Sequence, residues 1–200
     1  MAGKLFVISG PSGAGKGSIV EKLMAKDDKL YFSVSATTRP KRDYETEGRE
    51  YFFVSREDFL DRIEKGKMLE CAEFAGNYYG TPAGPVDEKL NAGCDVILDV
   101  ETNGMYSVKA LRPEAVTMFV YPPSFAELER RLRKRNTETE ERIQSRLKQS
   151  RLECAHAQDY DYIIINDDLE LAAEEARAIM TAEKCRTAER LHILKEDKTL

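Results

Sequence analysis

A glycine-rich segment near the start of the chain has the residue types and spacing of a phosphate-binding loop. Residues 10–18 read GPSGAGKGS, between a short apolar run at 5–8 and a helical pattern at 19–25. Its glycines let the backbone curl so that successive N–H groups point inward, and the helix that follows adds positive potential there. Lys16 can reach the terminal phosphates of a nucleotide. The alternative is a glycine-rich turn with an incidental lysine.

One position departs from the usual form of this loop. A Ser or Thr normally follows the lysine and binds the magnesium ion that the phosphates carry. Here Gly17 occupies that position and Ser18 comes one residue later. The spacing leaves open whether Ser18 supplies the hydroxyl in place of that residue.

A basic segment is the second candidate for phosphate chemistry. Residues 130–151 carry nine basic side chains against three acidic ones. Arg142 and Arg146 are one helical turn apart, and Arg135 ends the helix expected before them. Arginines placed in this way could fold over transferring phosphates and stabilise their developing charge. The alternative is a solvated helical face in an otherwise acidic protein.

Two arginines and two tyrosines form a further possible anion site. Arg39 and Arg42 offer guanidinium forks that match a phosphate, and the phenols of Tyr51 and Tyr79 can donate to it. Surface arginines and core tyrosines are the alternative. A separate candidate is Asp99, which ends an apolar strand at the edge where ligands collect in parallel α/β sheets.

Apolar strands alternate with helices along the chain, which predicts parallel βαβ units in a three-layer α/β fold. The shorter, more polar strands within 35–83 interrupt this order, and we interpret them as an inserted, mostly β subdomain. We expect strands at 5–8, 31–38, 51–54, 68–74, 95–100, 116–121 and 162–166, and a polar turn at 76–82. We expect helices at 19–25, from Ser55 to Gly66, and at 85–92, 125–135, 138–156 (with Thr137 as its cap) and 169–191.

Composition excludes several classes of function. The 200 residues suit one globular unit, and the net charge of −5 with a pI near 5.3 argues against nucleic-acid or membrane-surface binding. The four cysteines form no Cys-x-x-Cys pair, and the two histidines have no partners at metal-ligand spacing. No signal peptide or stretch of ~18 apolar residues is present, so we expect a soluble, cytoplasmic protein.

Several of these segments together resemble guanylate kinases, which belong to the nucleoside monophosphate kinase group of P-loop enzymes. The similarity runs from the glycine loop to Asp168, and it is carried by GPSGAGKGS, SVSATTRPKR, EGREYFFV, FAGNYYGTP, VILDV, TETEERIQSRL and IIINDD. The resemblance implies a P-loop core (1–34, 84–125 and 151–200), a GMP-binding insert (35–83) and a helical lid (126–150). It also implies transfer of the γ-phosphoryl group of Mg-ATP to GMP, with dGMP as a further acceptor.

The resemblance assigns roles to individual residues. The implied ATP-binding residues are Gly10, Pro11, Ser12, Gly13, Ala14, Gly15, Lys16, Gly17, Ser18 and Asn166. The implied GMP-binding residues are Ser35, Arg39, Arg42, Tyr51, Glu70, Tyr79, Thr81 and Glu101, of which Ser35, Glu70 and Thr81 would bind the guanine edge. Lys16, Arg39, Arg135 and Arg146 would act in catalysis, and Ser18 and Asp99 would bind magnesium.

Two segments depart from the family pattern. The family commonly has Leu-Asp-Ile-Asp followed by Gln-Gly, whereas this chain has Glu101 at the last Asp position and Asn103-Gly104 after it. Residues 43–47 lack the Pro-Gly pair often found there, which leaves the shape of that loop open.

Two other functions stay open, and both differ from GMP phosphorylation. One is a non-catalytic peptide-binding module like those of scaffold proteins, which usually lose the glycine loop that this chain keeps. The other is a kinase for a different acceptor. The sequence also leaves open whether the protein is a monomer or a homodimer.

Overall fold

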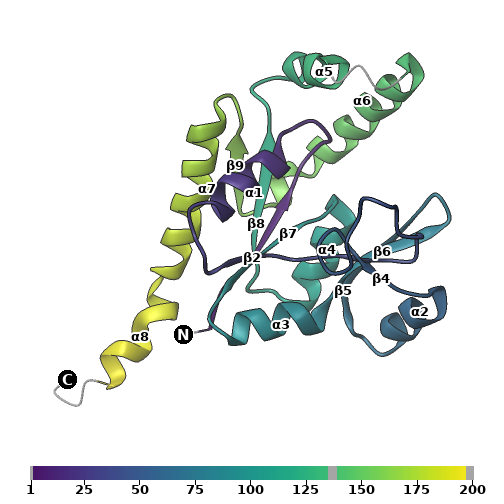
Figure 1. The fold of residues 1–200 in the computed structure, drawn as a ribbon. Coiled ribbons are helices and arrows are strands. Elements are labelled where there is room, and N and C mark those ends of the chain that lie inside the picture. Colours follow the sequence, from purple (N-terminus) through teal and green to yellow (C-terminus); the bar gives the residue numbers. More distant parts are fainter. Residues whose placement is uncertain (1, 135–138, 197–200) are drawn as a thin grey trace.

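The computed structural model describes residues 2–134 and 139–196 and has two sheets (Figure 1). The larger is parallel, with its strands in the order β2–β7–β1–β8–β9. They are β1 (Leu5–Ser9), β2 (Leu30–Phe32), β7 (Asp95–Asp99), β8 (Val116–Tyr121) and β9 (Tyr162–Ile165). A parallel sheet requires crossover connections, and these are helical here.

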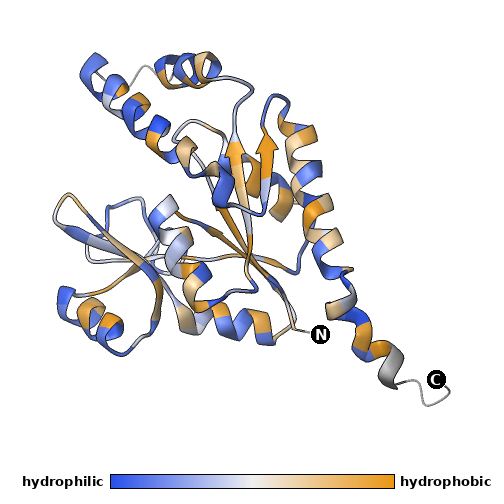
Figure 2. Ribbon diagram, turned by 180° about the vertical axis from the view of Figure 1, so that it is seen from behind, coloured by the Kyte–Doolittle hydropathy of each residue, from blue (hydrophilic) through white to orange (hydrophobic). Residues whose placement is uncertain are grey.

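Helices cover both faces of this sheet, because alternate side chains of its strands point to opposite sides. In β1, Phe6 and Ile8 join the core under α1 (Lys16–Met24) and α7 (Leu169–Lys184). Leu5 and Val7 join the core under α3 (Ala83–Asn91) and α4 (Thr102–Leu111). Figure 2 shows the apolar strands between these helices. The predicted three-layer α/β fold is therefore confirmed.

The second sheet is smaller and mixed, with the order β4–β3–β6–β5. Its elements are β3 (Ala36–Thr37), β4 (Phe52–Phe53), α2 (Arg56–Glu64), β5 (Met68–Phe74) and β6 (Asn77–Pro82). It has its own core around Phe59, Met68 and Ala36. Leu69, by contrast, packs into the core of the large sheet, and so β5 fixes the small sheet against it.

Two helices project beyond the carboxyl edge of the large sheet. They are α5 (Phe125–Lys134) and α6 (Glu140–Ala155), and they pack on each other through Leu128, Leu132, Ile143 and Leu147. Ser124 accepts a hydrogen bond from the backbone N–H of Glu127 and so caps the start of α5. The predicted cap Thr137 lies outside the described residues. In the structure α6 begins after Thr139, whose side chain makes no capping hydrogen bond.

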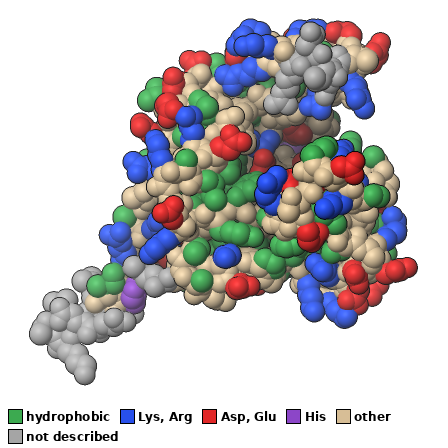
Figure 3. All heavy atoms as spheres, in the orientation of Figure 1, with side chains coloured by type: hydrophobic (Ala, Val, Ile, Leu, Met, Phe, Trp, Pro, Cys, Tyr) green, Lys and Arg blue, Asp and Glu red, His purple; other side chains and the backbone are tan. Residues whose placement is uncertain are grey.

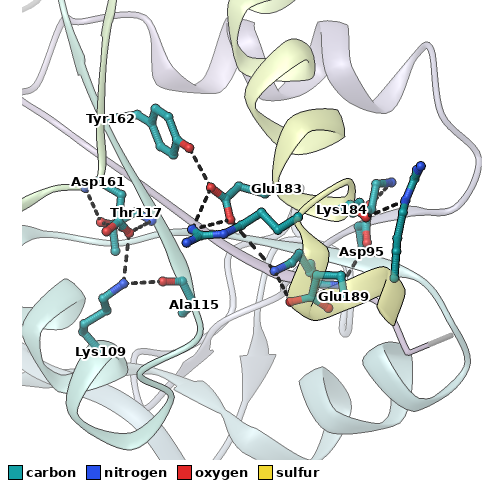
Figure 4. Close-up of polar contacts among 12 residues, drawn as sticks. Asp95, Lys109, Ala115, Thr117, Asp161, Tyr162, Glu183, Lys184 and Glu189 are labelled. Atoms are coloured by element: carbon teal, nitrogen blue, oxygen red, sulfur yellow. Dashed lines mark hydrogen bonds and ion pairs between the residues drawn. The ribbon is translucent and has the colours of Figure 1, made fainter. Parts of the chain in front are cut away.

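Polar contacts fix the C-terminal helices to the opposite edge of the sheet (Figure 4). The buried carboxylate of Asp95 accepts from the backbone N–H of Lys4 (2.9 Å) and from Lys184 (2.6 Å). Glu183, also buried, accepts from the hydroxyl of Tyr162 at 2.6 Å. After Lys184 the chain continues into α8 (Thr187–Glu196). Among the described residues, no helix combines the length and apolar character needed to cross a membrane.

Three sequence predictions about strands were wrong. The run 31–38 is two strands in different sheets, because the chain leaves the large sheet after Phe32 and enters the small one at Ala36. The expected polar turn at 76–82 is mostly strand β6, since the hairpin reverses at Ala75 and Gly76, both of which have positive φ. The last strand is only half buried: β9 is an edge strand, and Ile163 is 53% exposed.

Two predictions about helices also need correction. The sequence reading placed no helix after Asp99, whereas α4 follows it directly and buries Met105 and Val108. The expected single helix at 169–191 is two helices, interrupted at Cys185 and Arg186. Between α6 and β9 the chain forms a single turn, η1 (Ala157–Asp159).

Candidate active site

The glycine loop connects β1 to α1, and close contacts require glycine at two of its positions, Gly10 and Gly15. A Cβ atom on Gly10 would lie 2.1 Å from the carbonyl oxygen of Val120 in β8. One on Gly15 would lie 2.2 Å from Nδ2 of Asn166, and both glycines have positive φ. Such contacts are shorter than any side chain tolerates, so the loop closes against the ends of β8 and β9 only with glycine at these positions.

The side chain of Asn166 hydrogen-bonds to this loop. It is buried just after β9, and its Nδ2 donates to the carbonyl oxygen of Ala14 at 2.7 Å. Arg131 of α5 donates to the carbonyl oxygen of Asn166 at 2.9 Å. The side chains of Pro11 and Ala14 are themselves buried, so these two residues present only their backbone to a ligand.

Lys16 lies at the first turn of α1, inside a cavity of about 310 Å³. Its Nζ donates to the carbonyl oxygen of Gly10 at 2.7 Å and lies 3.8 Å from the carboxylate of Asp99. Desolvation raises the pKa of Asp99, and the Lys16 cation opposes that rise. The residues that line this cavity are Ser12, Gly13, Gly15, Lys16, Gly17, Ser18, Glu21 and Asp99.

A second cavity, of about 640 Å³, lies between the small sheet and α4. Asp99 lines it as well, so the two cavities share this carboxylate as a common wall. It brings together five of the residues predicted to bind GMP, namely Ser35, Tyr51, Glu70, Tyr79 and Glu101. Figure 3 shows the surface hollowed between the α5–α6 pair and the small sheet.

Glu70 is a carboxylate of the second cavity that is fixed by a hydrogen bond and by close packing. Thr81, which is buried behind it, donates to Glu70 Oε1 at 2.7 Å. A Cβ atom on Gly104 would lie 3.2 Å from the other carboxylate oxygen, so α4 packs closely on this group. Desolvation raises the pKa of Glu70, and the hydrogen bonds from Thr81 oppose the rise. Thr81 therefore contacts the carboxylate and does not line the cavity.

The predicted anion site is assembled only in part. The guanidinium of Arg39 lies 5.5 Å from the ring centroid of Tyr51, whose ring in turn contacts Tyr79 with 6.0 Å between centroids. Arg39 also forms a two-pronged ion pair with Glu45. The guanidinium of Arg42 instead donates to the hydroxyl of Tyr44 at 2.7 Å on the exposed surface.

Among the described residues of the basic helices, Arg146 reaches the glycine loop with its side chain. Arg146 Nη1 donates to the Ser12 hydroxyl at 2.8 Å, whereas Arg142 is exposed. The predicted catalytic Arg135 lies outside the described residues. Others of the nine basic side chains pair with glutamates on the helices themselves, as Arg133 does with Glu129, and Figure 3 shows basic groups over α5 and α6. For those residues the solvated-face interpretation is correct.

Comparisons with known proteins are consistent with this geometry. The family model described as guanylate kinase matches residues 2–183. Guanylate kinase from Desulfitobacterium hafniense is 46% identical over 191 residues, which are 96% of each chain. The enzyme from Halalkalibacterium halodurans is 46% identical over 97% of each chain.

The chain belongs to the guanylate kinase family. The crystal structure of guanylate kinase from Anaplasma phagocytophilum has the same fold, with a TM-score of 0.76 and 32% identity over 99% of this chain and 96% of that one. The expected family and enzyme class, an ATP:GMP phosphotransferase, are confirmed.

Some site residues of this guanylate kinase were missed from the sequence. Asn103 and Gly104 line the second cavity at the start of α4, and Met105, Val108 and Leu111 at helical spacing are a signal that could have located that helix. Arg131 was counted among the basic residues, but nothing in its spacing distinguished it. Glu45 gave no signal, because its partner Arg39 is reached only through an irregular loop.

Two of the glycines that line the donor cavity, Gly15 and Gly17, provide a matched test of the loop geometry. Gly15→Ala should abolish ATP binding, because its Cβ would displace Asn166. Gly17→Ala should retain ATP binding and raise the free energy of unfolding by roughly 0.5–1 kcal/mol, since Gly17 is helical and has no neighbour within 4 Å of a Cβ. Calorimetric ATP titration and denaturant unfolding measure both. Equal ATP binding by the two variants would contradict this account.

Proposed function

We propose that this protein transfers the γ-phosphoryl group of ATP to GMP across the wall shared by its two cavities. ATP binds at the glycine loop and GMP binds between the small sheet and α4. The observation that carries this proposal is the position of Asp99, which lines both cavities while Lys16 lies 3.8 Å from it. A donor and an acceptor phosphate bound in these cavities would meet beside a fixed lysine.

On the donor side, we assign the ATP phosphates to the backbone N–H groups of the loop and to Lys16. The loop surrounds an N-terminal helix end, where N–H groups and the helix dipole both attract anions. The Ser12 hydroxyl and Arg146 already lie over the loop, so Arg146 needs little movement to reach a bound phosphate. Arg135 is proposed as a second lid arginine, from the family resemblance alone.

On the acceptor side, Glu70 gives the site its preference for guanine. A carboxylate accepts hydrogen bonds from both N1–H and the exocyclic amine of guanine, whereas adenine has no N1–H. Thr81 donates to the carboxylate and thereby fixes it, and Ser35 lines the same cavity. Leaving a buried polar group unpaired costs ~1–3 kcal/mol, so AMP is disfavoured.

The phosphate of GMP is assigned to Arg39, Tyr51 and Tyr79, which lie together, and to Arg42 after its side chain turns inward. Glu101 lines the cavity and is exposed, which suits contact with the acceptor nucleotide at its open side. Nothing in the cavity that we have described demands a ribose 2′-hydroxyl, so dGMP is included among the acceptors.

The chemistry requires positioning and charge neutralisation and no general base. The attacking oxygen belongs to a phosphate that is already ionised at neutral pH. Lys16 and the arginines neutralise the charge that develops on the transferring group, and this effect is large in a site that excludes water. The α5–α6 lid and the insert would exclude that water on closing over the substrates.

Magnesium fits the donor cavity. Mg²⁺ binds through one or two protein oxygens together with substrate phosphates. Ser18 and Asp99 supply a hydroxyl and a carboxylate to the cavity that contains Lys16, and the described residues contain no cluster of three or more metal-binding side chains. When bound, the ion would neutralise phosphate charge. Ser18 and Asp99 are the residues we propose to hold it.

The hydrophobic clusters support dividing the chain into units with separate roles. The small sheet and the α5–α6 pair each have a hydrophobic cluster of their own, apart from the two clusters of the large sheet. We therefore propose 35–83 as the GMP-binding insert, 126–150 as the lid, and the remainder as the P-loop core. The intact loop lysine argues against a purely peptide-binding role.

Replacing the guanine-binding carboxylate tests the acceptor assignment. Glu70→Gln should lower kcat/KM for GMP by about 10- to 100-fold, because an amide presents a donor to a base edge that itself donates. The Kd for ATP should stay within about twofold. Glu57→Gln on α2 is exposed and serves as the control. Equal losses for GMP and ATP would reject the guanine-reading role of Glu70.

The same carboxylate predicts a pH dependence of stability. The pKa of Glu70 is raised in the folded state. The stability that Glu70 contributes is therefore fully present below its ordinary pKa of about 4.5, and it is lost as the pH rises through the folded-state pKa. Glu70→Gln does not titrate, so its free energy of unfolding should rise relative to that of the unmodified protein between pH 4 and pH 7. Denaturant unfolding at several pH values measures this difference, and a constant difference would contradict the prediction.

Removing the loop lysine separates transfer from acceptor binding. Lys16→Ala should lower kcat by at least about 100-fold, since it removes the cation from the shared wall. GMP should still raise the Tm of the variant, because the acceptor cavity is intact. Lys22→Ala, at a partly exposed position of α1 where Lys22 pairs with Glu170 of α7 outside both cavities, is the control and should leave kcat unchanged. Retained turnover in Lys16→Ala would remove Lys16 from the mechanism.

A further inference from the structure

Glu45 is a buried carboxylate in the irregular loop between β3 and β4, and the mechanism above gives it no role. Glu45 is only 6% exposed, although its chain neighbours Tyr44 and Thr46 are exposed. Burial of a charge is costly unless ion pairing and hydrogen bonds compensate. The groups that pair with Glu45 therefore indicate its role.

The partners of Glu45 are the two arginines of the predicted phosphate site. Arg39 donates from Nη2 to Oε1 at 2.7 Å and from Nη1 to Oε2 at 3.0 Å. The backbone N–H of Arg42 donates to Oε2 at 2.8 Å, and the N–H of Glu45 donates back to the Arg42 carbonyl at 3.1 Å. One carboxylate thus fixes the side chain of one arginine and the backbone of the other.

The donor inventory of Arg39 shows what this pairing leaves available. A guanidinium has five N–H donors. Two are taken by Glu45, and Nη1 also donates to the carbonyl oxygen of Pro40 at 2.8 Å. Glu45 and Pro40 leave the donors on Nε and Nη2, which lie side by side along one edge, and Tyr79, itself assigned to the phosphate site, also interacts with this guanidinium. A pair of parallel donors is the arrangement that binds two oxygens of a phosphate.

The surroundings of the guanidinium hold it in this orientation. It lies 5.5 Å from the ring centroid of Tyr51 and 5.8 Å from that of Phe53. Glu45, and to a smaller extent Tyr79, raise the pKa of Arg39, while Arg39 holds the pKa of Glu45 down at about 2. Both groups therefore stay ionised throughout the physiological range.

We propose that Glu45 is a positioning residue for acceptor binding: it holds the Nη1–Nη2 edge of Arg39 and thereby directs the adjacent Nε–Nη2 edge toward the phosphate of the nucleoside monophosphate. This rests on the proposed function, in which Arg39 binds that phosphate. It extends that function by explaining how a long, flexible side chain is ordered before the substrate arrives. Ordering in advance reduces the entropy lost on binding.

The proposal predicts an effect confined to ligands that carry a phosphate. Glu45→Gln preserves volume but breaks the symmetric ion pair, so the Kd for GMP should rise about tenfold, a typical coupling between contacting residues. The Kd for guanosine, which has no phosphate, and the Kd for ATP should stay unchanged. Glu50→Gln, in the same loop but paired with Arg49, is the matched control. A merely structural role would weaken guanosine binding equally.

A double-mutant cycle tests whether Glu45 acts through Arg39. In the Arg39→Ala background, Glu45→Gln should weaken GMP binding no further. Additive losses, or GMP binding by Glu45→Gln as tight as or tighter than in the unmodified protein, would overturn the proposal; tighter binding would make Glu45 a competitor of the phosphate. If Arg39→Ala alone leaves GMP binding unchanged, the phosphate site itself is wrong.

Folding of the variants is checked by circular dichroism and by Tm. Should Glu45→Gln fail to fold, Glu45→Asp keeps the charge on a side chain that is one methylene shorter. This side chain is too short to accept both hydrogen bonds from Arg39. It should raise the Kd for GMP in the same direction while leaving guanosine binding unchanged. An unchanged Kd for GMP in Glu45→Asp would likewise reject the proposal.

Discussion

The position of Lys16 between the carbonyl oxygen of Gly10 and the carboxylate of Asp99 is the constraint on which the rest of the site depends. It requires the glycine loop to close against β8 and β9, which only Gly10 and Gly15 permit. It also requires β1 and β7 to be neighbours in a parallel sheet, so that both strands end at the same edge. The two cavities then share the Asp99 carboxylate, with the Lys16 cation beside it.

The acceptor side follows a different principle, in which buried anions are fixed by specific partners. Glu70 is held by Thr81 and is closely packed by α4 at Gly104, so in the proposed role its burial would make an unmatched base costly. Glu45 is fixed by Arg39 and by the backbone of Arg42. In the function we propose, recognition of the base and of the phosphate would lie on the small sheet and its loops, while the large sheet would supply the transfer site.

The sequence predicted the parts of the site that depend on local spacing. The glycine loop, the strand ending at Asp99 and the capped helices follow from periodicity and turn chemistry over about ten residues. What depends on contacts between distant residues was not predictable: β2 and β3 share one alternating run yet join different sheets, and β6 has the polar composition of a turn. The Arg39–Glu45 pair forms within a loop that has no periodic pattern. Resemblance to a family supplied the acceptor residues that spacing alone left open.

The central claim is that the small sheet selects guanine while the glycine loop supplies the phosphoryl donor. Its most direct test is a coupled ADP-release assay with Mg-ATP and each of GMP, AMP, CMP and UMP at equal concentration. We predict turnover with GMP and rates with the other three that are lower by at least about 100-fold, because each leaves Glu70 without its paired donors. Comparable turnover with another acceptor would keep the kinase chemistry and contradict the assignment of Glu70.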